Sequence, residues 1–221
     1  DWFLKYRHDL VKHITFAESD DDSSRMLLSI PSEERLKHVI SVLLDETEFL
    51  SEYGIRSLSK RHKEEPFELE IQGIKHCVAY IPGESDSWMF GGNSNWRGPI
   101  WFPINYILIE SLRHYYEFYE NDLMVECPTG SGNLMNLNQV ADELMNRLSK
   151  LFLMDDKEKH RPSMISHANG IDPALWQQNV LFYEYFHGDT GEGLGASHQT
   201  GWTSLIATCM EMLNREPPAT D

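Results

Sequence analysis

The sequence predicts an all-α fold, a toroid of amphipathic helices whose connecting loops gather on one face. Apolar residues recur at helical spacing in several segments, and long connections rich in glycine and aromatic residues separate these segments. Connections of this length without regular structure are uncommon in a compact domain unless they build a site. The longest are expected at about 82–102, 120–136, 154–172 and 187–201.

Five segments have the pattern of amphipathic helices. Ser32 is a residue type that caps helices, and two glutamates follow it where a first turn would begin. Pro103 suits the first position of the second helix, whose apolar stripe is expected to include Ile104 and Ile107. The remaining helices are expected at about 138–152, 175–185 and 202–213.

One segment departs from the helical pattern. Apolar residues alternate with glutamates from Phe67 to Ile71, and Gln72-Gly73 separates this run from a second apolar run that includes Val78. Alternation on both sides of a short turn with glycine is typical of a β-hairpin. We therefore expect one small hairpin beside the helices.

Charge and composition restrict the partners of the chain. Its 221 residues are 41% hydrophobic and carry a formal net charge of -16. Nucleic acid or an anionic membrane would require a basic surface, so neither is expected as a partner. The three cysteines are scattered and no N-glycosylation sequon is present, which favours a cytoplasmic protein. No cluster has the spacing of a zinc site, so neither a metal nor another cofactor is expected.

The loop that leads into the second helix has side chains suited to a sugar. It combines turn-forming glycines with Asn93, Asn95, Trp96, Arg97 and Trp101. Indole faces match the apolar faces of a sugar ring, and guanidinium and amide groups match its hydroxyls. A packed turn that uses tryptophan as core filler is the alternative interpretation.

A second informative segment surrounds Glu184. The residue lies among aromatic side chains at the predicted end of a helix, next to a glycine-rich turn. A poorly hydrated carboxylate is suited to proton transfer, which makes Glu184 a candidate general base. A surface glutamate paired with an arginine is the alternative. His198 and Gln199 are candidate hydrogen-bond donors to hydroxyl groups.

Taken together, these segments resemble glycoside hydrolase family 63, the group of α-glucosidases and mannosylglycerate hydrolases. The resemblance is closest to bacterial and fungal members and covers most of residues 27–210. The matching stretches follow the order of the family, at 83–87, 91–103, 125–132 and 182–202.

The resemblance implies the C-terminal part of an (α/α)6 toroid, with the active site in a funnel formed by the loops between helices. Residues 1–216 would form this part of the catalytic domain. The composition of residues 217–221 separately predicts a disordered tail. The missing N-terminal part of the same enzyme would then be a partner of the chain, together with a carbohydrate substrate. The isolated fragment would be inactive or nearly so.

The resemblance also implies hydrolysis of a terminal α-glycosidic bond with inversion, without a cofactor. Glu184 falls on the position of the general base, six residues before Thr190. Glu192 is the second choice for that role. The substrate-binding residues carried over or added as candidates are Trp96, Arg97, Trp101, Asn93, Asn95, Tyr185, His198, Gln199 and Trp202.

The general acid is where this sequence departs from the family pattern. The family acid is an aspartate in an upstream motif that has no counterpart here. Asp86 and Asp189 lie in suitable loops, but neither matches that motif. The alternative function is therefore a non-catalytic carbohydrate-binding or helical scaffold domain.

Overall fold

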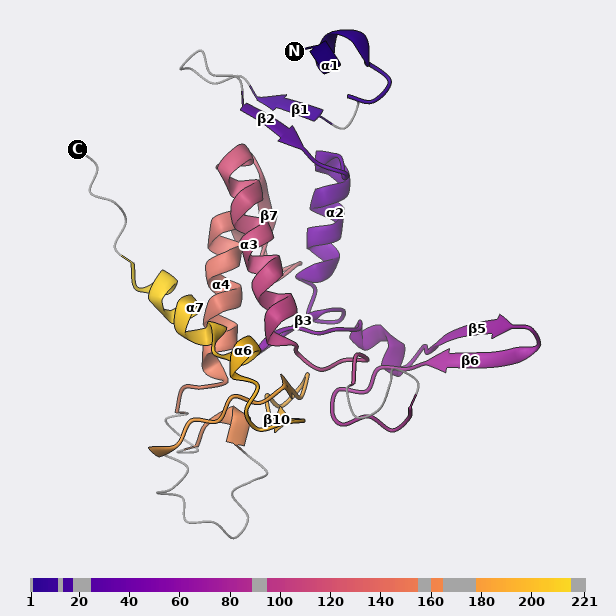
Figure 1. Cartoon of the computed structure of the whole chain (residues 1–221), viewed down its shortest axis with the longest axis vertical. Helices are drawn as coiled ribbons and strands as arrows, with labels where there is room; N and C mark the ends of the chain where they lie inside the picture. Colours follow the sequence, from indigo (N-terminus) through magenta and orange to yellow (C-terminus); the bar gives the residue numbers. More distant parts are fainter. Residues whose placement is uncertain are drawn as a thin grey trace.

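The computed structural model describes residues 2–11, 14–17, 25–88, 95–154, 160–164 and 178–215. Three helices, α2 (Glu33–Leu43), α3 (Phe102–Tyr119) and α4 (Leu137–Lys150), run side by side through the centre of the molecule (Figure 1). The loop before α3 and strand β10 (Gly193–Leu194) lie at one end of them. The predicted tail at 217–221 and the candidate residue Asn93 lie outside the described residues. Among the helices described, none is long and apolar enough to cross a membrane.

Helix α2 forms where the sequence predicts it, at Glu33–Leu43. The backbone N–H of Arg35 donates to the Oγ of Ser32 at 3.3 Å, which satisfies one of the amides that a helix start leaves without a partner. Leu36 and Ile40 are its buried residues, one turn apart on a single face.

Helices α3 and α4 form the central pair. Helix α3 spans Phe102–Tyr119 with Pro103 in its first turn. Helix α4 spans Leu137–Lys150 and begins with a capping box in which the side chains of Asn136 and Gln139 each accept a hydrogen bond from the other residue's backbone amide. Both predicted helices are confirmed within one or two residues.

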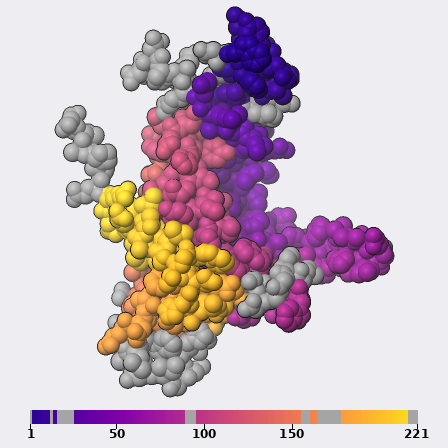
Figure 2. Space-filling view, viewed as in Figure 1, coloured from indigo at the N-terminus to yellow at the C-terminus, as the bar shows by residue number. Residues whose placement is uncertain are grey.

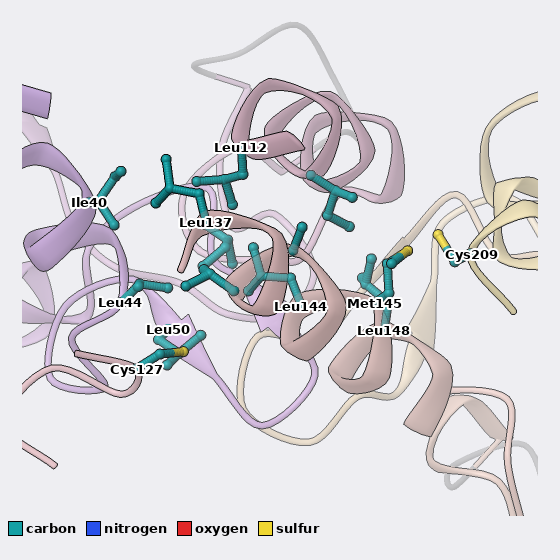
Figure 3. Packing of buried hydrophobic residues seen from close by; sticks show 14 of the residues in the cluster. Ile40, Leu44, Leu50, Leu112, Cys127, Leu137, Leu144, Met145, Leu148 and Cys209 are labelled. Carbon is teal, nitrogen blue, oxygen red and sulfur yellow. The ribbon is translucent and has the colours of Figure 1, made fainter. Parts of the chain in front are cut away.

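The core lies where α2, α3 and α4 meet (Figure 3). Helix α4 supplies Leu137, Val140, Leu144 and Leu148, which repeat every three or four residues and are fully buried. The apolar stripe of α3 is shifted from the predicted one, because Ile107 is 60% exposed while other positions of the helix face the core. Those buried positions of α3 include Asn105, Ile109 and Leu112.

The C-terminal helices confirm one prediction, and the segment before them corrects another. Short helix α6 at Thr200–Thr203 leads into α7 at Leu205–Leu213, as the spacing predicts. Of the predicted helix at 175–185, residues 175–177 lie outside the described residues and residue 178 is helical, but the prediction is wrong for 179–185, which is not helical and leads into a strand. The backbone of this segment bonds to a distant segment, because the N–H of Glu184 donates to the carbonyl of Ala196 at 2.9 Å and the carbonyl of Phe182 accepts from the N–H of Gln199 at 2.7 Å.

The all-α assignment needs correction because the described residues also form five two-stranded antiparallel sheets. Pairs of two or three residues are too short to show a period-2 pattern in the sequence, so most of them were not predictable. Small helical turns complete the described elements, α1 at Trp2–Tyr6, η1 at Lys60–Lys63 and η2 at Pro162–Met164. The strands pair as β1 (Ile14–Ala17) with β2 (Arg25–Leu28), β3 (Leu50–Ser51) with β4 (Gly54–Ile55), β5 (Phe67–Ile71) with β6 (Ile74–Val78), β7 (Met124–Glu126) with β8 (Leu134–Asn136), and β9 (Tyr185–Phe186) with β10 (Gly193–Leu194).

The predicted hairpin is confirmed as β5–β6, an arm that projects from the body of the molecule (Figures 1 and 2). Gln72 and Gly73 form its turn with positive φ values of 52° and 79°. Two successive positive φ values are typical of a type I′ turn, which matches the twist of paired strands.

The loops do not all gather at one end, in contrast to the prediction. The 120–136 connection follows the C-terminus of α3, whereas the loop with Trp96 precedes its N-terminus. A helix of 18 residues separates its two ends by roughly 27 Å. The 120–136 connection thus begins at the opposite end of α3 and then turns back along α2, where the N–H of Thr129 donates to the carbonyl of Leu44 at 3.0 Å.

Candidate functional site

The loop before α3 is held together by Asn95 and Arg97. Asn95 is fully buried, and its Nδ2 donates to the carbonyl oxygens of Ile81 at 2.8 Å and Gly83 at 2.6 Å. Its Oδ1 accepts from the backbone N–H of Arg97 at 3.0 Å. These bonds use the amide to shape the loop, so Asn95 supports the site rather than lining its surface.

The guanidinium of Arg97 is buried and binds a neighbouring loop. Its Nη2 donates to the Oγ of Ser85 at 3.2 Å and to the Oδ1 of Asp86 at 2.6 Å. A buried guanidinium is stable only when charge and hydrogen-bond partners compensate for lost water, and Asp86 provides that compensation. Asp86 is therefore committed to an ion pair.

Aromatic rings connect the predicted sugar-binding residues to the segment of Glu184. Trp96 stacks on Trp101 with ring centroids 3.8 Å apart and an interplanar angle of 4°. Trp101 stacks in turn on Tyr185 at 4.8 Å and contacts the ring of Trp202 at 5.7 Å. Trp101 and Tyr185 are buried, whereas Trp96 remains 39% exposed at the end of the stack. We call these four rings the indole stack.

Glu184 lies directly before the buried Tyr185 and is bonded twice to Ala196. Its backbone N–H donates to the carbonyl of Ala196 at 2.9 Å, and its Oε2 accepts from the N–H of Ala196 at 3.1 Å. Gly195 has a φ of 69°, and a Cβ at that position would lie 2.7 Å from the Oε2 of Glu184. Glycine is required there because both the backbone conformation and the carboxylate exclude a side chain.

A second carboxylate, Glu84, faces the same two segments. The Tyr185 hydroxyl donates to its Oε2 at 2.6 Å, and the N–H of Gly195 lies 3.4 Å from its Oε1. Burial, followed by the hydrogen bond to Glu84 and the charges of Glu84 and Glu184, raises the pKa of Tyr185. The phenol therefore stays protonated and acts as a donor.

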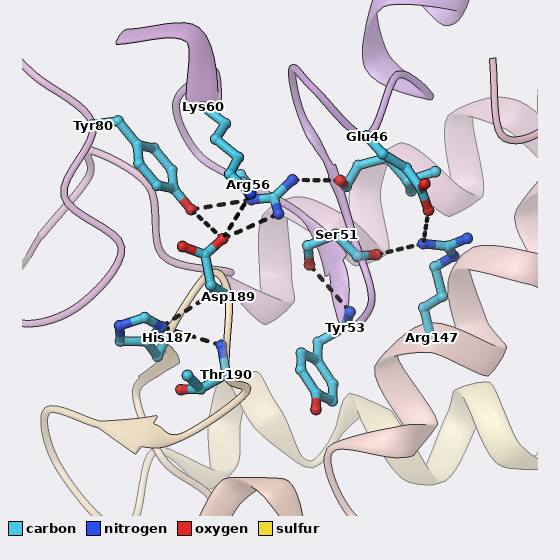
Figure 4. Close-up of polar contacts among 11 residues, drawn as sticks. Glu46, Ser51, Tyr53, Arg56, Lys60, Tyr80, Arg147, His187, Asp189 and Thr190 are labelled. Atoms are coloured by element: carbon cyan, nitrogen blue, oxygen red, sulfur yellow. Dashed lines mark hydrogen bonds and ion pairs between the residues drawn. The ribbon is translucent and has the colours of Figure 1, made fainter. Parts of the chain in front are cut away.

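The turn after β9 is fixed by Asp189 (Figure 4). Its Oδ1 accepts from Nη2 of Arg56 at 3.1 Å and from the hydroxyl of Tyr80 at 2.9 Å, and Lys60 Nζ lies 4.0 Å away. Burial opposes ionisation of Asp189, but the Tyr80 hydrogen bond and the Arg56 charge outweigh it and lower its pKa. A general acid requires a raised pKa, so Asp189 does not have the environment of that role.

His187 holds the start of the same turn. Its Nδ1 accepts the backbone N–H groups of Asp189 at 3.1 Å and Thr190 at 3.2 Å (Figure 4). Gly188 follows, with room only for glycine, since a Cβ would lie 2.4 Å from the carbonyl oxygen of Gly98. The turn therefore packs closely against the loop that carries the indole stack.

The remaining candidates lie on both sides of this cluster. His198 is exposed and forms a bridge with Phe182, and the backbone N–H of Gln199 donates to the carbonyl of Phe182 at 2.7 Å. Glu192 lies across the turn from His187, whose N–H donates to the Glu192 carbonyl at 2.7 Å. Among the described residues, no group of three histidine, cysteine, aspartate or glutamate side chains could hold a metal ion.

The structure thus brings the rings of Trp96, Trp101, Trp202 and Tyr185 together near Glu184, and the buried Arg97 binds the neighbouring loop. Sequence reasoning did not assign a role to Glu84, although the stretch 83–87 was recognised as part of the family pattern. It also missed the anchors of the turn, Arg56 and Tyr80, because their distance in sequence from Asp189 gives no signal. Those contacts become visible only in three dimensions.

Comparisons with known proteins show the family of the chain. Residues 23–203 match the family described as the mannosylglycerate hydrolase MGH1-like glycoside hydrolase domain. The chain is 50% identical over 210 residues to the uncharacterized protein YMR196W of Saccharomyces cerevisiae, an alignment that covers 94% of this chain and 19% of that protein.

Two glucosidases are more distant relatives. The mannosyl-oligosaccharide glucosidase of Saccharomyces cerevisiae is 26% identical over 177 residues, which is 80% of this chain and 15% of the relative. The probable mannosyl-oligosaccharide glucosidase of Schizosaccharomyces pombe is 27% identical over 186 residues, which is 84% of this chain and 16% of the relative. The chain spans less than a fifth of the length of each of these relatives. Because the family match covers most of its sequence, the chain belongs to the MGH1-like glycoside hydrolases and is distantly related to the mannosyl-oligosaccharide glucosidases.

Proposed function

We propose that the complete protein hydrolyses a terminal α-glycosidic bond with inversion, and that Glu184 is the general base. The proximity of Glu184 to the indole stack is the observation that carries the proposal: a Cβ at Gly195 would lie 2.7 Å from the Oε2 of Glu184 and 2.8 Å from the ring of Tyr185, which stacks on Trp101. An exposed indole such as Trp96 suits the apolar face of a sugar, and its stacking on Trp101 connects it to the ring of Tyr185 near the Glu184 carboxylate.

The base would act on water rather than on the sugar. Inverting glycosidases keep their two carboxyl groups roughly 6.5–9.5 Å apart so that a water fits between the base and the anomeric carbon. The bond from the N–H of Ala196 to the Oε2 of Glu184 would orient the carboxylate while the other oxygen accepts the proton of the water.

The general acid would come from another part of the complete protein. Both aspartates considered from the sequence are already engaged, Asp86 by Arg97 and Asp189 by Arg56 and Tyr80. The expectation that the acid lies upstream, which follows from the family resemblance, is consistent with these ion pairs. It remains part of the proposal.

The substrate class follows from the family and its named relatives. The family is named after a mannosylglycerate hydrolase, and two relatives are named as mannosyl-oligosaccharide glucosidases. We therefore propose an α-glucoside or α-mannoside with a small or oligosaccharide aglycone. Candidate substrates for a first panel are mannosylglycerate, glucosylglycerate and α-glucosyl disaccharides.

The test is a hydrolysis assay on the complete protein and its Glu184→Gln variant. Wild type is expected to release the sugar as the β-anomer, detected by NMR before mutarotation. The variant is expected to lose about two to four orders of magnitude in kcat while its unfolding midpoint is unchanged. Glu192→Gln is the matched control and is expected to keep most activity.

Either of two results would overturn this proposal. If Glu184→Gln keeps wild-type turnover, the base assignment is wrong. If the wild-type protein binds the sugars of the panel in calorimetric titration but hydrolyses none of them, the alternative of a non-catalytic carbohydrate-binding domain is supported instead.

A further inference from the structure

The stretch 83–86 is bound on one side to the loop before α3. The Gly83 carbonyl accepts from Nδ2 of Asn95 at 2.6 Å. Ser85 and Asp86 accept from Nη2 of Arg97 at 3.2 Å and 2.6 Å. Because the donors are buried, this stretch is fixed relative to the indole stack.

Glu84 binds the other side, where Glu184 lies. One oxygen accepts from the Tyr185 hydroxyl at 2.6 Å, and the other faces the N–H of Gly195 at 3.4 Å. Tyr185 follows Glu184 in the chain, and the N–H of Ala196, next to Gly195, donates to the Glu184 carboxylate at 3.1 Å. The carboxylates of Glu84 and Glu184 thus accept hydrogen bonds from two consecutive backbone amides, those of Gly195 and Ala196.

The residues that Glu84 contacts are held in fixed positions by packing and backbone conformation. Tyr185 is fully buried and stacked on Trp101, so its hydroxyl has a fixed location. The positive φ of Gly195 and the tight approach of Glu184 leave this turn little freedom. A change at Glu84 would therefore alter the turn and the base together.

We infer that Glu84 is a positioning residue that clamps Tyr185 and the 195–196 turn, and thereby fixes the carboxylate of Glu184 relative to the indole stack. The inference rests on the proposed role of Glu184 as the base. Although Glu84 is exposed, both of its oxygens face protein donors, and the proposed action is therefore on the turn. A misplacement of about 1 Å in a catalytic group costs about 100-fold in rate.

The kinetic test compares Glu84→Ala, Glu84→Gln and Tyr185→Phe in the complete protein, with the substrate that the panel identifies. Glu84→Ala is expected to lower kcat by about 100-fold with little change in KM. Glu84→Gln keeps an oxygen for the Tyr185 hydroxyl and is expected to recover most of that loss. Glu70→Ala, on the exposed hairpin arm, is the control and should leave kcat unchanged.

A double-mutant cycle tests whether Glu84 acts through Tyr185. Residues that share one interaction have non-additive effects, so Glu84→Ala combined with Tyr185→Phe is expected to be no slower than Glu84→Ala alone. Additive losses would contradict the clamp. A raised KM with unchanged kcat in Glu84→Ala would also contradict it and would make Glu84 a substrate contact.

Amide hydrogen exchange provides a readout that does not depend on activity. Loss of the clamp is expected to speed exchange of the amides of Gly195 and Ala196 in Glu84→Ala, and unchanged exchange would overturn the inference. If Glu184→Gln remains active, the proposed function fails, yet this measurement still decides whether the clamp exists. If Glu184→Gln is inactive while Glu84→Ala and Tyr185→Phe have wild-type kcat, only the clamp is refuted.

Discussion

Two regions of the molecule are stabilised by different interactions. The helical half consists of α2, α3 and α4, and the loop half consists of the loops around the candidate site. Helix α4 buries Leu144 and Leu148 completely in the apolar core, in contacts without direction. The loop half instead buries polar groups, among them Asn95, Arg97 and Arg56, each hydrogen-bonded to another segment. Hydrogen bonds have strict geometry, so the loop half fixes the positions of side chains as well as their burial.

The two kinds of interaction have different roles. Apolar packing in the helices supplies most of the stability, because burial of hydrocarbon is the dominant favourable term in folding. The polar network of the loops contributes less stability per group, since each bond replaces one with water. Its contribution is the placement of Glu184 beside the indole stack.

The largest effect on stability is expected from a substitution in the helical half. Leu144→Ala removes fully buried methyl groups and leaves a cavity, so it should lower the free energy of unfolding by about 3 kcal/mol. Urea-induced unfolding of the complete protein would measure this change. Ile107→Ala on the exposed side of α3 is the control and should cost less than about 1 kcal/mol. Equal costs at the two positions would contradict the assignment of the core.

An intermediate effect is expected at the turn of the loop half. Asp189→Asn removes the charge that binds Arg56 but keeps an oxygen for Tyr80, so it should cost about 1 kcal/mol at neutral pH. The pKa of Asp189 is lowered in the folded protein, so its charge contributes stability above the ordinary value of 3.8. That contribution is lost as the pH falls through the folded pKa.

The pH dependence of stability tests whether the ion pair of Asp189 and Arg56 makes this contribution. The difference in stability between wild type and Asp189→Asn should be constant from pH 7 to pH 5 and should shrink as the pH falls below 3.8. Denaturant titrations at several pH values would measure it. A difference that persists unchanged at the lowest pH would show that the charge of Asp189 is not what stabilises the turn.

The smallest effect is expected at the hairpin arm. Leu69 lies in β5 and is 47% exposed, so Leu69→Ala should change the free energy of unfolding by no more than about 0.5 kcal/mol. The same unfolding experiment would measure it. A cost as large as that of Leu144→Ala would mean that the arm is packed against another part of the complete protein.

The same contrast explains how much the sequence could predict. Helices α2, α3 and α4 follow from periodicity and from start signals such as Ser32 and Pro103, which are local. The strand at Tyr185 was predicted as a helix because its partner, Gly193–Leu194, is too short to be recognised. Local signals identify elements well when those elements are long.

The candidate site was predictable in its residue types but not in its supports. Trp96, Trp101 and Glu184 were identified from two segments whose composition suits a sugar. Their joint placement depends on contacts such as Tyr185 with Glu84, which join positions about a hundred residues apart. A single sequence carries no record of such pairs, so Glu84 had no assigned role before the structure.

The most direct measurement of the central claim is the crystal structure of the complete Glu184→Gln protein with an intact substrate. We expect the sugar ring to lie against the exposed face of Trp96, with a water between the side chain at position 184 and the anomeric carbon. A sugar bound away from the indole stack, with its anomeric carbon out of reach of position 184, would contradict the account.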